Sequence, residues 1–155
     1  MTKKVLVLSA SFRKHGNSDM LCDRFIQGAR EAGNEVEKIY VSDMRIGYCR
    51  GCGVCNRTHK CVQNDDMAAV LDKMVAADVI VMATPVYFYS MNGQLKTLID
   101  RTVPRYEEIR GKDFYYIVAA ADDNRDNMRR TIEGFRAFAD DCLEGSREKG
   151  IVYGV

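Results

Sequence analysis

The 155-residue sequence lacks an excess of either charge, because 23 Lys and Arg face 22 Asp and Glu. It has no polybasic run, so the electrostatic signature of a protein that binds nucleic acid or a membrane surface is missing. No stretch approaches the roughly 18 consecutive apolar residues of a transmembrane helix. There are no internal repeats and only two prolines, Pro85 and Pro104. These absences favour a single domain, residues 1–155, that acts on a small partner of neutral or mixed charge.

An export signal is also missing. Two lysines precede the apolar stretch VLVLSA, but this stretch is short for a signal-peptide core and the charged FRKH follows it directly. We therefore expect a first β-strand here and a cytoplasmic protein. In a reducing cytosol, clustered cysteines more often bind metal or carry out redox chemistry than form structural disulfides.

Apolar runs alternate with amphipathic segments along the chain. The runs predict strands at residues 4–10, 35–41, 78–84, 114–120 and 150–155. The amphipathic segments predict helices at 18–32 (Ser18 as N-cap, Gly33 as stop), at 65–76 (opened by Asn64), at 92–102 and at 125–143. This alternation predicts a doubly wound α/β fold, a five-stranded parallel sheet with helices on both faces.

The fold predicts where a ligand binds, because open parallel sheets bind ligands beyond the carboxyl ends of their strands. After the first strand, SASFRKHGNS offers small and hydroxyl residues that lead into a helix N-terminus, as in a phosphate cradle. It matches neither GxGxxG nor GxxxxGK[ST]. After the third strand, TPVYFYSMNGQLK brings aromatic side chains to the same edge, and AADDNRD follows the fourth strand. Together these loops predict a phosphorylated, planar ligand.

Four of the six cysteines fall in CRGCGVCNRTHKC, inside a cysteine-rich insertion at about residues 42–64. Loops that long in a compact domain are usually functional. The two-residue gaps let the thiolates of Cys49, Cys52, Cys55 and Cys61 converge on one centre. Three interpretations stay open: an iron–sulfur cluster, free or reversibly oxidised thiols, and a structural zinc site with His59 as a further ligand. Cys22 and Cys142 lie on apolar helical stripes and are expected in the core.

In order and spacing, the serine-rich loop, the cysteine run and TPVYFYSMNGQLKTLIDR resemble the flavodoxin-like NAD(P)H-dependent FMN reductases, and in particular the iron–sulfur flavoproteins. The resemblance implies strand order 2-1-3-4-5, FMN as cofactor and NAD(P)H as reductant. It also implies a [4Fe–4S] cluster on the four cysteines in the iron–sulfur members. The implied FMN contacts are Ser9, Ser11, Arg13, Gly16, Asn17 and Ser18 for the phosphate, and Thr84, Pro85, Val86, Tyr87, Phe88, Tyr89, Asn92, Ala120, Ala121 and Asp122 for the ribityl chain and ring.

The resemblance further implies hydride transfer to FMN and passage of electrons to a small-molecule or protein acceptor. No catalytic triad or carboxylate pair stands out in the sequence. The implied activity does not need one, because flavin supplies the difficult chemistry. A homodimer or homotetramer is expected from the family. Family members continue past the fifth strand into a last helix, whereas this sequence stops at Val155. We therefore expect uncovered apolar surface beside the first helix, shielded by a neighbouring subunit or by further polypeptide.

Overall fold

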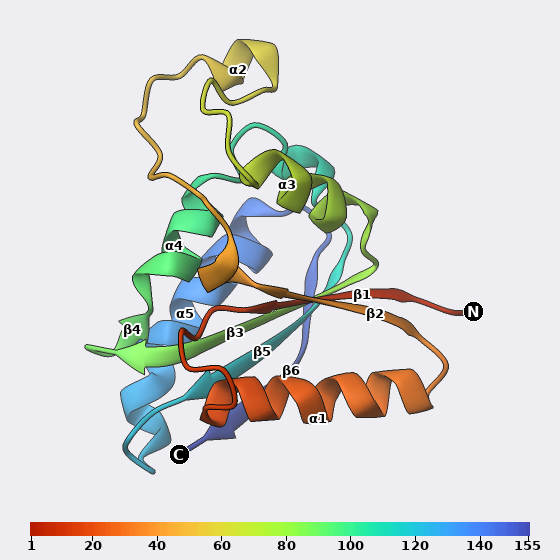
Figure 1. The fold of residues 1–155 in the computed structure, drawn as a ribbon, viewed down its shortest axis with the longest axis vertical. Helices are drawn as coiled ribbons and strands as arrows, with labels where there is room; N and C mark the ends of the chain where they lie inside the picture. Colours follow the sequence, from red (N-terminus) through yellow and green to blue (C-terminus); the bar gives the residue numbers. More distant parts are fainter.

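The computed structural model describes residues 1–155 and contains the predicted parallel sheet. The strands lie in the order β2-β1-β3-β5-β6, so the five long strands follow the predicted 2-1-3-4-5 order (Figure 1). Their bounds are β1 Lys4–Ser9, β2 Glu35–Tyr40, β3 Val79–Tyr87, β5 Asp113–Ala119 and β6 Arg147–Gly154. A short β4, Ser90–Met91, pairs antiparallel with the end of β3 and was not predicted.

Helices cover both faces of the sheet. The α1 helix, Asn17–Glu31, lies across one face, and the remaining long helices lie on the other (Figure 1). These are α3 Met67–Ala76, α4 Gly93–Asp100 and α5 Arg129–Arg136. The short elements are α2 Cys55–Thr58, the 3-10 turns Val41–Asp43, Tyr106–Glu108 and Arg125–Met128, and a π-helical turn Ala137–Cys142.

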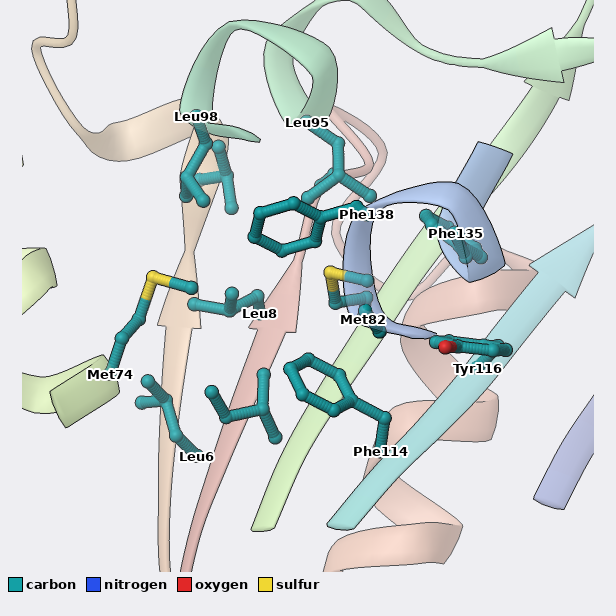
Figure 2. Packing of buried hydrophobic residues seen from close by; sticks show 14 of the residues in the cluster. Leu6, Leu8, Met74, Met82, Leu95, Leu98, Phe114, Tyr116, Phe135 and Phe138 are labelled. Carbon is teal, nitrogen blue, oxygen red and sulfur yellow. The ribbon is translucent and has the colours of Figure 1, made fainter. Parts of the chain in front are cut away.

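The larger core lies between the sheet and α3, α4 and α5. It holds 24 buried residues, against eight in the cluster under α1. Figure 2 shows how Leu8 and Met82 from the strands meet Leu95 and Leu98 of α4 and Phe138. Because β1, β3 and β5 are buried on both faces, their sequences are apolar nearly throughout, which is why they could be recognised.

Several predicted details are wrong. The α1 helix begins at Asn17 after Gly16, and Ser18 lies inside its first turn with no capping hydrogen bond at the helix start. The α3 helix begins at Met67 and not after Asn64, because the intervening carboxylates bond elsewhere. The predicted helix at 125–143 is divided into 3-10, α and π turns, and the π turn leaves Cys142 exposed. Cys22 is buried as predicted, and burial raises the pKa of its thiol to about 12.

Part of β6 lies on the sheet face beside α1, where the sequence predicts uncovered apolar surface. On this side β6 presents Gly150, Val152 and Gly154, all half-buried. A Cβ on Gly154 would lie 2.7 Å from the Leu21 side chain, so α1 already packs closely against this strand. No helix of the structure combines the length and the apolar character needed to cross a bilayer.

Candidate functional site: three loops and a cysteine-rich segment at one sheet edge

The loops after β1, β3 and β5 meet at one edge of the sheet. The strands are direct neighbours, with Ser9 paired to Ala83 and Pro85 paired to Ala119, so their carboxyl ends lie side by side (Figure 1). A hydrogen bond from Ala10 N to Ala83 O, 3.0 Å long, continues this pairing past the end of β1. The structure therefore brings together the three segments expected to hold a phosphorylated, planar ligand.

The loop after β1 divides into a buried layer and an exposed layer. Ser9 and Ser18 are buried, and the Ser9 hydroxyl donates to Asp19 Oδ1 over 3.0 Å. Ser11 is 5 % exposed, and its Oγ accepts the Arg13 backbone N–H at 3.0 Å. The exposed layer consists of Arg13 and Asn17, with Gly16 half-buried between them. The Arg13 guanidinium is thus the most accessible donor of the predicted phosphate cradle, since the Asn17 amide already donates to Val155 O over 3.0 Å.

Asp19 holds this loop from beneath. Its side chain is 1 % exposed and accepts the His15 backbone N–H at 2.8 Å, which fixes His15 at a φ of 65°. Lys38 of β2 lies 2.6 Å from Asp19 and 2.6 Å from Asp23. Burial opposes ionisation of Asp19, but the bonds from Lys38, His15 and Ser9 outweigh it and hold its pKa below the ordinary value. A buried ion pair therefore organises the loop.

The loop after β3 is fastened to the loop after β1 by Asn92. The Asn92 side chain is 2 % exposed and donates to Ala10 O over 2.7 Å, while its backbone N–H donates to Thr84 Oγ1 over 3.0 Å. Its Oδ1 accepts the Leu95 N–H, so it also caps α4. Thr84 is fully buried, with its hydroxyl donating to Pro85 O. Asn92 and Thr84 thus set the shape of the loop from within.

The aromatic turn, residues 87–90, carries most of the exposed aromatic surface at this edge. Phe88 is fully exposed, and Tyr87 and Tyr89 are each 52 % exposed. Phe88 and Tyr89 have φ of 48° and 64°, the left-handed conformation that a two-residue hairpin turn requires and that Gly or Asn usually supplies. Such strain persists where the surroundings impose it, often at functional sites. Pro85 and Val86 lie half-buried behind the turn.

The loop after β5 completes the edge. Ala120 is half-buried, and its N–H donates to Gly154 O over 3.1 Å. Ala121 and Asp122 are exposed. Asp122 Oδ1 accepts the Asn124 N–H at 2.8 Å, which folds the loop back on itself. This loop therefore brings small residues and a folded-back acidic tip to the edge.

The cysteine-rich segment, residues 44–64, projects from this edge as a closed loop (Figure 1). Its two ends run together in a stem that is held by hydrogen bonds between Arg45 and Asp66, between Gly47 and Asp65, and between Tyr48 and Gln63. Gly47 lies close to the other end of the segment, since a Cβ there would lie 2.6 Å from Gln63 Oε1. The stem is well defined, and all four cysteines lie beyond it.

The four cysteines line one cavity of about 200 Å³. His59 is not among its lining residues, so the structure does not place it as a ligand beside them. No three of the sulfurs lie within 4.8 Å of one another. Tetrahedral zinc with bonds near 2.3 Å would need its sulfurs about 3.8 Å apart. A cubane cluster binds each sulfur to a different iron and so holds the four sulfurs farther apart than a single zinc ion does.

Charge around these cysteines also suits an anionic centre. The segment contains no Asp or Glu, but it carries exposed cations that form no salt bridge: Arg45, Arg50, Arg57 and Lys60. Four thiolates give a cluster a net negative charge that such cations balance.

Sequence reasoning missed four charged residues of the site: Asp19, Lys38, Asp65 and Arg101. Arg101, 2 % exposed, donates to Asp65 over 2.8 Å and to Gly47 O over 2.6 Å. It follows Leu98 by three residues on the apolar stripe of α4, and a charge at such a position signals a buried partner. No comparable local signal marks Lys38.

Comparison with known proteins agrees with this geometry. A curated iron–sulfur flavoprotein of Archaeoglobus fulgidus is 38% identical over 101 residues, which is 65% of this chain and 46% of that protein. One from Methanosarcina thermophila is 37% identical over 64% of this chain and 52% of its own length. The chain thus spans about half the length of these relatives.

An NAD(P)H:quinone oxidoreductase from Methanothermobacter marburgensis shares the fold, with a TM-score of 0.76 at 15% identity over 100% of this chain and 86% of that chain. The family model described as NADPH-dependent FMN reductase matches residues 3–131. The chain therefore belongs to the NADPH-dependent FMN reductase family.

Proposed function

We propose that the protein is an NAD(P)H-dependent oxidoreductase that binds FMN at the three loops and a [4Fe–4S] cluster on Cys49, Cys52, Cys55 and Cys61. Two observations carry the proposal: the family match over the segments that hold the three loops, and a cavity lined by all four cysteines. Bound FMN would take a hydride from NAD(P)H and pass electrons onward, to a small-molecule or protein acceptor. The sequence shows no acid–base pair, so the role of the chain's own residues is to bind and orient the FMN.

Each loop has a distinct part in this proposal. Arg13 and the donors around it bind the phosphate, and Asp19 keeps them in place from below. Tyr87 and Phe88 shield one side of the flat ring, and the loop at Ala120 and Ala121 approaches from the other. Burial of the ring between these loops keeps water from the reacting face.

Visible spectra of protein purified with and without oxygen test the proposal. Two resolved flavin bands that NADPH bleaches are expected, with a broad brown absorbance in the anaerobic sample. A flavin spectrum without the brown component contradicts the cluster. A colourless protein that contains zinc contradicts both parts and favours a non-catalytic thiol or zinc sensor.

Replacing Cys55 by serine is expected to abolish the brown absorbance and to reduce bound iron from about four atoms per chain to near zero. FMN content should stay unchanged, because the flavin loops lie on the sheet edge and not in the segment. Iron analysis and flavin release measure both quantities. The matched control is Cys142→Ser, which removes an exposed thiol outside the segment and should retain iron. Equal iron in the two variants contradicts the ligand set.

We also propose that the chain assembles with a second copy through the aromatic turn. Phe88 is fully exposed on a strained backbone, an arrangement that a partner surface would stabilise. Light scattering should show a dimer or tetramer for the wild type and a monomer for Phe88→Ser. Phe12→Ser is the control, since Phe12 is 64 % exposed but lies on the loop after β1. A monomeric wild type contradicts the proposal.

A further inference from the structure

Arg101, the residue that ends α4, is the largest side chain that the fold buries completely. One nitrogen, Nη1, donates to Gly47 O over 2.6 Å and to Asp65 Oδ2 over 2.8 Å. The other, Nη2, donates to Asp65 Oδ1 over 3.0 Å. Gly47 stands at one end of the cysteine-rich segment and Asp65 at the other. A single guanidinium therefore joins both ends of the segment to α4.

The third nitrogen of this guanidinium, Nε, is buried and has no acceptor in the protein. In the planar guanidinium, the Nε–H and the second N–H of Nη2 point from the same edge, so that edge is free. Arg101 and Cys61 line one cavity of about 550 Å³. A buried donor without an acceptor is costly, so this edge needs a partner.

We propose that Arg101 is the positioning residue of the cysteine-rich segment: it locks the segment's two ends and offers its free N–H edge to a ligand sulfur in the cavity that it shares with Cys61. The inference rests on the proposed cluster. Hydrogen bonds to ligand sulfurs and nearby positive charge make a cluster easier to reduce. Arg101 would thus set both where the cluster is held and the potential at which it accepts an electron.

The test compares Arg101→Gln and Arg101→Lys with Arg105→Gln in the FMN-loaded protein. Arg105 lines the same cavity but pairs with Asp72 and Glu108 outside the segment, which makes it the matched control. Three quantities are measured: iron affinity in reconstitution, the midpoint potential of the cluster, and the rate of trypsin cleavage at Arg50 and Arg57 before iron is added. FMN content reports that each variant is folded.

Arg101→Gln should weaken iron binding by about 10- to 100-fold, the effect typical for residues that support metal ligands. Its segment should be cleaved about tenfold faster, because the stem has lost its clamp. Arg101→Lys keeps the positive charge but loses the planar set of guanidinium N–H donors. It should therefore retain a cluster, but the midpoint potential should be more negative than in the wild type, because fewer hydrogen bonds reach the ligand sulfur. Arg105→Gln should match the wild type in all three measurements.

If both Arg101 variants match the wild type in midpoint potential, iron affinity and cleavage rate, the inference is wrong. The proposed cluster is not affected by that result. If the wild type itself binds no iron, the cluster proposal fails, and the cleavage rate alone decides whether Arg101 clamps the segment. Faster cleavage in Arg101→Gln then supports the clamp, and an unchanged rate refutes it.

Discussion

Replacing Asp19 by alanine is expected to lower the free energy of unfolding by about 3 kcal/mol, because it removes the buried carboxylate that pairs with Lys38 and accepts two further hydrogen bonds. Lys38 is only 13 % exposed and would keep Asp23 as its sole carboxylate partner. The Ser9 hydroxyl and the His15 N–H would also lose their acceptor. Chemical denaturation measures the change. FMN affinity should fall as well, because the loop after β1 rests on this carboxylate.

The matched control is Asp23→Ala, which removes the other carboxylate on Lys38. Asp23 is 51 % exposed, so this change should cost less than about 1 kcal/mol. If the two alanine variants are equally stable, Asp19 does not organise the loop.

The pH dependence of stability is a second test of the Asp19–Lys38 pair. The pKa of Asp19 is lowered in the folded state, so its stabilisation is complete above the unfolded pKa and is lost as the pH falls through the folded pKa. The stability of wild type and Asp19→Asn should therefore differ by a constant amount at neutral pH and converge below about pH 4. Denaturation midpoints measured across this range test the sign.

Replacing Ser11 and Arg13 together by alanine is expected to weaken FMN binding on the order of 100-fold, from the loss of two hydrogen bonds to a charged group. Ser11 braces the loop through the Arg13 N–H, and the Arg13 side chain is free in solvent to meet an anion. Fluorescence titrations with FMN and with riboflavin make the test specific to phosphate. The wild type should prefer FMN strongly, whereas the double variant should bind the two nearly equally.

Lys14→Ala is the control for this prediction. Lys14 lies on the same loop, but its ammonium is 2.7 Å from Asp43 and 4.9 Å from the centre of the Tyr40 ring. It should leave the preference for FMN unchanged. A double variant that still prefers FMN as strongly as the wild type shows that the phosphate lies elsewhere.

The centre of the sheet could be predicted from the sequence because β1, β3 and β5 are largely buried and are therefore nearly continuous apolar runs. The two-residue β4 could not, since it depends on a turn in which Phe88 and Tyr89 take a conformation usually supplied by Gly or Asn. The Asp19–Lys38 pair joins α1 to β2, and nothing in the sequence relates two oppositely charged residues on separate elements. Strands and loops can thus be predicted from local residue types, whereas polar contacts between distant residues can be identified only in the folded structure.

The α4 helix has Asn92 at its start, bonded to two of the flavin loops, and Arg101 at its end, bonded to the cysteine-rich segment. Its eight residues span about 12 Å at a rise of 1.5 Å each. It therefore fixes the separation between the two proposed sites. One inserted residue would lengthen α4 by only about 1.5 Å but would rotate Arg101 by about 100° around the helix axis, away from Asp65. A change in the length of this one short helix would thus alter both the distance between the proposed sites and the contact of Arg101 with the cysteine-rich segment.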